Sequence, residues 1–93
     1  MNERMLATVE MTSRAVQALR KVAEQRGIKP EIIISKARHH DIAHARQAVF
    51  VRLWAQDMSL QQIGKAFDVH HTTVHFGIRA EVQRMLDLLE ASE

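Results

Sequence analysis

Only three glycines and one proline interrupt the 93 residues of this chain, and tyrosine and cysteine are absent. Glycine and proline are the residues that disfavour a helix most strongly. Apolar residues recur at spacings of three and four, whereas no useful length of sequence alternates β-branched with polar residues as a half-buried strand does. These patterns predict an all-α fold with about five helices.

The expected helix boundaries follow from capping residues and helix breakers. Thr12 or Ser13 can cap a first helix that ends at Gly27, and Pro30 suits the first turn of a short second helix. Asp41 is the expected cap of the third helix, which is predicted to lie at the centre of the core.

Ser59 and Gln62 have the spacing of a capping box, in which each side chain bonds the backbone of the other residue. They predict a fourth helix from Leu60 to about Phe67, followed by a last helix from about His71. In chain order, the five helices are expected at residues 12–27, 31–35, 41–54, 60–67 and 71–89.

A chain of this length forms one domain. We expect residues 12–91 to be that domain, residues 1–11 to be an arm or an extension of the first helix, and residues 92–93 to be a tail. The absence of cysteine excludes disulfides and thiolate chemistry and is typical of a reducing compartment, here the cytoplasm. No apolar run approaches the ~20 residues of a membrane span, so none is expected.

The last two helices and the turn between them have the pattern of a helix-turn-helix. Gly64 allows the two helices to approach closely, Asp68 is a short polar residue that tolerates a left-handed turn, and Val69 fills the turn. Val74 and Ile78 then face the core. The start of the last helix must therefore turn its polar side chains outward, and in helix-turn-helix proteins such residues contact base edges in the major groove.

Charge is unevenly distributed along the chain. Residues 35–84 hold seven Lys and Arg against four Asp and Glu, a local balance of +3, whereas residues 85–93 hold three acids and no base. All six histidines lie between His39 and His75. Because imidazole titrates near pH ~6.5, this segment gains positive charge on mild acidification. The layout favours a polyanionic partner, with DNA affinity rising as the pH falls from about 7.5 to about 6.

From about Pro30 to Arg84 the sequence resembles the C-terminal DNA-binding domain of the bacterial replication initiator DnaA, and small stand-alone bacterial and phage proteins similar to that domain. The matching stretches are ARQ at 45–47, SLQQIGKAF at 59–67 and HTTV at 71–74. The resemblance implies a helix-turn-helix fold of the Trp-repressor type, double-stranded DNA as the partner, and a role in regulating transcription or replication.

The resemblance also implies roles for individual residues. Members of the family read the major groove through a His-Thr-Thr segment and place a basic loop in the neighbouring minor groove. Together with the outward residues of the last two helices, the expected DNA-binding residues are Lys36, Arg38, His39, His40, Arg46, Gln47, Lys65, His70, His71, Thr72, Thr73, His75 and Arg79.

Two departures from the family pattern alter these expectations. His70 stands where the family has an acidic residue, so a donor to purine edges replaces an acceptor for cytosine N4. The loop holds Ala37, His39, His40 and Asp41 where more arginines are typical. The expected DNA target therefore differs from the initiator's. No Gly-x-x-x-x-Gly-Lys motif is present, so ATPase activity is not expected.

A metal site and a catalytic site are the alternatives to this interpretation. His40 and His44, and also His71 and His75, are four apart, a spacing that can hold zinc. Structural zinc sites usually include cysteine, and no Glu lies between either pair as in a metalloprotease, so no metal is expected. Serines and carboxylates show no catalytic spacing, so neither an enzyme nor a cofactor is expected.

The remaining alternative is a protein-interaction module that binds replication proteins rather than DNA. Phe76, near the expected reading surface, favours it, but we expect Phe76 to pack against the first or third helix. A homodimer through the apolar face of the first helix is a further alternative to burial of that face within the monomer. We also expect Trp54 to lie in the core or at its margin, and we expect core packing for Met5, Met11, Met58 and Met85.

Overall fold

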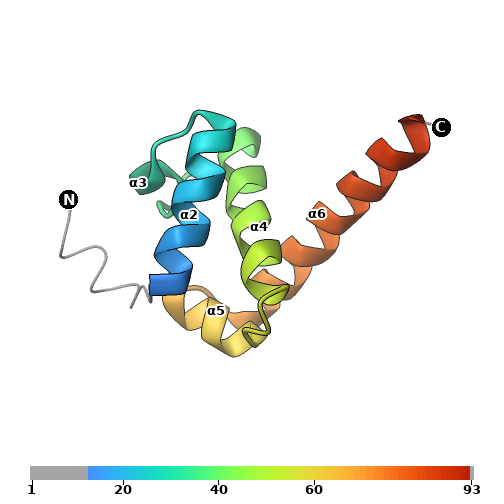
Figure 1. Cartoon of the computed structure of the whole chain (residues 1–93). Coiled ribbons are helices and arrows are strands. Elements are labelled where there is room, and N and C mark those ends of the chain that lie inside the picture. The colour runs from blue at the N-terminus through green and yellow to red at the C-terminus, as the bar shows by residue number, and fades with distance from the viewer. Residues whose placement is uncertain (1–12, 93) are drawn as a thin grey trace.

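The computed structural model describes residues 13–92, and five helices and no strand lie within that range (Figure 1). The predicted all-α class is confirmed. The helices are α2 (Ser13–Arg26), α3 (Pro30–Ile33), α4 (His40–Trp54), α5 (Leu60–Phe67) and α6 (His71–Ser92). The expected arm at 1–11, the Thr12 cap, Met5 and Met11 lie outside the described residues. None of these helices is both long and apolar enough to cross a membrane.

Two of the predicted helix ends have the expected geometry. Gly27 follows α2 with φ of 66°, and the N–H of Ile28 donates to the carbonyl of Ala23 at 3.1 Å. At the start of α5, the N–H of Gln62 donates to Ser59 Oγ at 3.1 Å, and the N–H of Ser59 donates to Gln62 Oε1 at 2.9 Å. The capping box is therefore present.

The predicted cap of α4 is wrong by two residues. His39 is the cap, because its Nδ1 accepts from the N–H of Asp41 at 3.3 Å, and the helix already begins at His40. A neutral imidazole nitrogen satisfies a helix-start N–H in the same way as a carboxylate oxygen. Asp41 instead lies in the first turn of the helix, where the helix dipole favours an acid.

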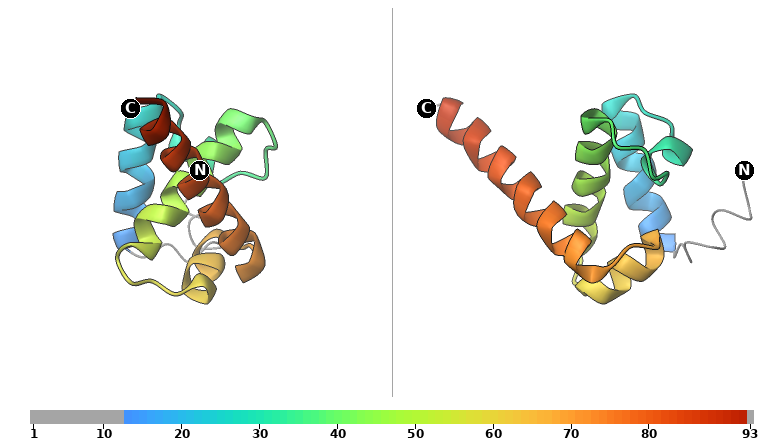
Figure 2. Two further views of the ribbon diagram at one scale, coloured as in Figure 1. Left: turned by 90° about the vertical axis from the view of Figure 1, so that its right-hand side faces the viewer. Right: turned by 180° about the vertical axis from the view of Figure 1, so that it is seen from behind.

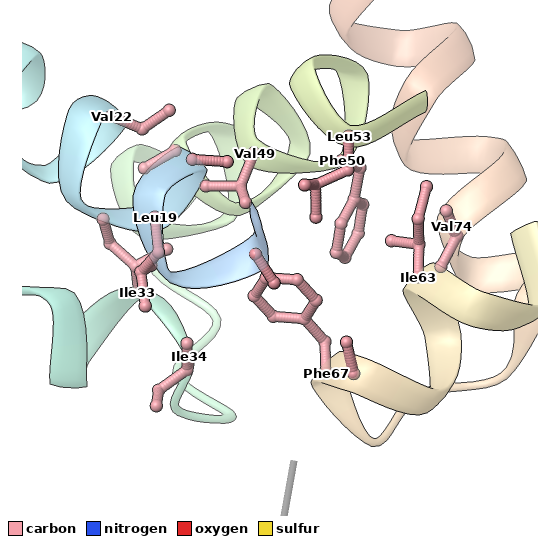
Figure 3. Packing of buried hydrophobic residues seen from close by; sticks show 14 of the residues in the cluster. Leu19, Val22, Ile33, Ile34, Val49, Phe50, Leu53, Ile63, Phe67 and Val74 are labelled. Carbon is pink, nitrogen blue, oxygen red and sulfur yellow. The ribbon is translucent and has the colours of Figure 1, made fainter. Parts of the chain in front are cut away.

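Helix α4 lies at the centre, with α2 on one side, the first half of α6 on the other and α5 across the end (Figure 1). Its buried residues are Ala45, Val49, Phe50 and Leu53, which agrees with the expectation that this helix lies at the centre of the core. The rings of Phe50 and Phe67 meet edge to face at 5.4 Å and join α4 to α5 (Figure 3). The apolar face of α2 is buried in the same core, so it is used within the monomer.

The turn between α5 and α6 has the predicted helix-turn-helix geometry. Asp68 adopts the left-handed conformation with φ of 55° and ψ of 46°, and the N–H of Val69 donates to the carbonyl of Gly64 at 2.9 Å. A Cβ added at Gly64 would lie 2.6 Å from the carbonyl oxygen of Val69. Glycine is therefore required for the close approach that starts α6 at its observed angle.

Helix α6 is longer than the body it packs on, and its second half runs outward from the other helices (Figures 1 and 2). Three packing predictions are corrected as a result. Phe76 is 66% exposed, Trp54 52% and Met85 47%, because the helices of residues 13–92 do not cover these side chains. Met58 is buried, as expected.

Candidate nucleic-acid interface

The start of α6 presents an apolar side to the core and a polar side to solvent. Val74 is fully buried and Ile78 is 7% exposed. The polar residues around them fall on the other side of the helix: His70, Thr72, Thr73 and His75 are exposed and His71 is half-buried. The first backbone N–H groups of a helix lack intrahelical partners and favour an anion. This end of α6 therefore offers hydroxyls and imidazoles on one surface.

His70 caps the start of α6 through its ring. Its Nδ1 accepts from the backbone N–H of Thr72 at 3.2 Å and lies 2.8 Å from the Thr72 hydroxyl. Because Nδ1 is an acceptor in this arrangement, the neutral ring carries its hydrogen on Nε2. His70 thus holds the helix start in place and offers an N–H donor to a ligand.

The loop between α3 and α4 is fastened to the helix-turn-helix turn. Lys36 Nζ donates to the carbonyl of Asp68 at 2.8 Å. The remaining members of the predicted loop, Arg38, His39 and His40, are exposed, and the two imidazoles are stacked with their centroids 4.9 Å apart. The structure therefore brings the basic loop beside the turn that precedes the start of α6.

Arg46 of α4 stabilises the loop between α3 and α4 through hydrogen bonds to its carbonyl groups. Its Nε donates to the carbonyl of Ile33 at 2.9 Å, and Nη2 donates to the carbonyls of Ser35 and Ala37 at 2.6 and 3.1 Å. Burial lowers the pKa of Arg46. The structure thus places the guanidinium of Arg46 within the fold, where it fixes the conformation of the residues around Lys36.

Gln47 lies in the α4–α6 contact, away from the exposed loop. Its Oε1 accepts from Arg84 Nη2 at 2.6 Å, and the same nitrogen donates to Glu81 Oε1 at 2.6 Å. Glu81 is 7% exposed and also pairs with Arg26 at 3.4 Å. Sequence reasoning missed this network, because only the packed fold brings α2, α4 and α6 together around one carboxylate.

The two remaining predicted cations lie on different elements. Lys65 is exposed on α5, and Arg79 is exposed on α6, two turns after His71. Arg79 also lines a groove that includes Trp54. The predicted DNA-binding residues therefore form four groups. The first lies at the start of α6, the second in the exposed loop between α3 and α4, and the third consists of Lys65 and Arg79. The fourth is the pair Arg46 and Gln47, whose side chains point into the fold.

Phe76 is a surface residue that sequence reasoning assigned to the core. Its ring lies 5.6 Å from that of His75, edge to face, and one turn beyond Thr72 on the outer side of α6. The helical period contained the signal, because a residue two positions after buried Val74 is rotated by about 200° to the opposite face.

The two histidine pairs of the zinc alternative do not assemble into one group. Within residues 13–92, the cluster of three potential metal ligands consists of His39, His40 and Asp41, all exposed, with their ligand atoms within 4.8 Å of one another. His44 lies beside His40, with ring centroids 5.7 Å apart, whereas His71 is not a member of that cluster.

The comparisons with known proteins agree with this geometry. The family described as "Bacterial dnaA protein helix-turn-helix" matches residues 16–80, which is more than half of the chain. No curated protein and no solved structure matches the chain significantly. The matched range includes α5, the turn at Asp68 and the start of α6 with its His-Thr-Thr segment. The chain therefore belongs to the bacterial DnaA helix-turn-helix family.

Proposed function

We propose that this protein binds double-stranded DNA and reads the major groove with the start of α6. Membership in the DnaA helix-turn-helix family supports DNA binding. The observation that carries the proposal is the exposure of Thr72, Thr73 and His75 around the buried Val74 and Ile78, at a helix start whose dipole favours a phosphate.

Some of these residues would recognise the base sequence, and the others would hold the protein on the DNA backbone. Thr72 and Thr73 offer hydroxyls and methyl groups to base edges, and His70 offers Nε2–H to a purine N7 or O6. Arg38 and the stacked imidazoles of His39 and His40 contact phosphates or the minor groove. Phe76 adds an apolar surface for a thymine methyl group.

Three of the expected DNA-binding residues act indirectly in this proposal. Arg46 shapes the loop that carries Arg38, and Lys36 ties that loop to the turn at Asp68. Gln47 contributes to the α4–α6 contact. A loop that is held in place before binding loses less conformational freedom on meeting DNA, so these internal bonds favour affinity.

The cellular role that follows is regulation of transcription or replication in the cytoplasm. The helix-turn-helix would act in that role by occupying a site on double-stranded DNA. A single module with few loop arginines makes few phosphate contacts, so its salt dependence is expected to be shallower than that of a large basic dimer.

Selection from a randomised duplex pool tests this function without knowledge of the target. The full chain should enrich one short motif, whereas His71→Ala with Thr73→Val should bind weakly and enrich none. Thr73→Val keeps the shape of the side chain and removes its hydroxyl. Arg38→Ala should enrich the wild-type motif with lower affinity, because a phosphate contact carries no sequence information.

Gln25→Ala provides the control, since Gln25 is an exposed polar residue on α2. It should reproduce the wild-type motif and affinity. Binding of wild type to no duplex at low salt would refute DNA binding. Enrichment of the same motif by the His71→Ala, Thr73→Val protein would refute the assignment of α6 as the reading element.

A further inference from the structure

The second half of α6 carries an apolar stripe that no helix in residues 13–92 covers. Met85 is 47% exposed, Leu86 46% and Leu89 64%. With Val82 they follow the 3, 4 spacing, so they share one face of the helix. Contiguous apolar patches on the surface of a monomer are often contact sites.

The stripe continues into a groove on the body of the protein. This groove has a volume of about 380 Å³ and lies between the end of α4 and α6. Its apolar walls include Trp54, Leu60, Ile78 and Val82, and Trp54 is 52% exposed. Apolar projections at 86 and 89 and an apolar groove around 78 and 82 therefore lie on the same side of one helix.

We propose that a second copy of this chain docks on this face, with the two α6 helices antiparallel. An isologous interface requires a surface that is complementary to itself about a two-fold axis. In an antiparallel pair crossing near Met85, Leu89 of each copy lies against Val82 of the other, at the edge of the other groove. Each copy thus supplies the projection and the groove, and the contact closes as a dimer.

The charge pattern selects the antiparallel arrangement. Residues 85–93 hold three acids and no base. A parallel pair would set these acidic ends side by side. In the antiparallel pair, Glu90 of one copy lies beside Arg79 of the other, because both residues flank the same edge of the stripe.

The interface is small, so the dimer should form with moderate affinity. The free half of α6, residues 82–92, is about 16 Å long at 1.5 Å per residue. Trp54 adds an aromatic side chain of the kind that dominates small interfaces. We therefore expect the monomer–dimer equilibrium to shift within a concentration range from micromolar to hundreds of micromolar.

Analytical ultracentrifugation of the full chain without DNA tests the proposal independently of its DNA binding. Wild type should change from monomer to dimer as concentration rises. Leu89→Glu should raise the dimer dissociation constant by about 30-fold or more, as expected for a central apolar contact. Ala91→Glu is the matched control, because it adds the same charge nearby on the opposite face of the helix and should leave the dissociation constant unchanged.

A charge exchange tests the orientation. Arg79→Glu and Glu90→Arg should each weaken the dimer by several-fold, and the two together should restore it. A monomer at every concentration overturns the proposal and leaves the stripe to another part of the chain or to another protein. Equal effects of Leu89→Glu and Ala91→Glu would overturn it as well. Circular dichroism verifies folding, and Leu89 is exposed enough for its substitution to preserve the core.

Discussion

The two halves of α6 have similar apolar spacing and opposite surroundings. In the first half, Val74 and Ile78 are buried against α4 and α5, and polar side chains face outward. In the second half, Leu86 and Leu89 continue the apolar pattern with no partner helix from the described chain beside them. A periodic stripe therefore predicts which residues share a face, but the rest of the fold decides whether that face is covered.

The largest difference in stability should appear when one apolar residue is truncated in each half of α6. Val74→Ala removes buried methyl groups and should lower the free energy of unfolding by roughly 2–3 kcal/mol. Leu89→Ala, measured at a concentration where the chain is monomeric, should change it by less than about 0.5 kcal/mol. Urea denaturation measures both. A comparable loss in the two variants would show that the second half is packed in the monomer.

The first half of α6 depends on the close contact at Gly64. Gly64→Ala should cost roughly 2 kcal/mol, because the new Cβ would lie 2.6 Å from the backbone oxygen of Val69 and the turn must shift. If the start of α6 contacts DNA as proposed, DNA affinity should fall as well, since the turn sets the angle at which α6 starts. Thermal unfolding gives the stability change. A variant as stable as wild type would contradict the required close approach.

A smaller effect is expected where the loop meets the first half of α6. Arg46→Lys keeps the charge and loses the planar group that donates to three carbonyls, so it should cost roughly 1 kcal/mol and loosen residues 35–38. Hydrogen exchange should rise in that loop and stay unchanged in residues 82–92. Uniformly faster exchange would instead indicate global destabilisation.

The smallest expected effect is a pH dependence of stability that arises from His44, which lies close enough to Arg84 of α6 to feel its charge. Burial and the positive charge of Arg84, together with His40, lower the pKa of His44, while Glu81 and Asp41 oppose the shift. The native state then binds fewer protons than the unfolded chain below pH ~6.5, so stability falls as the pH falls through that range. His44→Gln should flatten this decrease. An unchanged pH profile of the unfolding free energy would contradict the assignment.

Sequence reasoning succeeded where neighbouring residues determine the structure. The Ser59–Gln62 capping box, the left-handed Asp68 and the glycine at 64 follow from local backbone chemistry. It failed where distant parts of the chain meet. The inward orientation of Arg46 and Gln47 depends on hydrogen bonds that span 9 to 37 positions in sequence, which no local pattern encodes.

The sequence-based predictions were also wrong about the solvent exposure of some large apolar side chains. Phe76, Trp54 and Met85 were assigned to the core or its margin because large apolar side chains are usually buried. Their positions depend on where α6 diverges from α4, and this divergence is a property of tertiary packing. His39 was misjudged for a different reason, since statistical preferences rank Asp above His as a helix cap.

Backbone amide exchange with and without the selected DNA duplex tests the central claim most directly, because it reports on both halves of α6 in one experiment. Slower exchange in residues 70–76 and 36–39 on DNA binding, with little change at 85–92 under monomeric conditions, is the expected result. Protection confined to residues 82–92, with none at 70–76, would contradict the assignment of the start of α6 as the DNA-reading element.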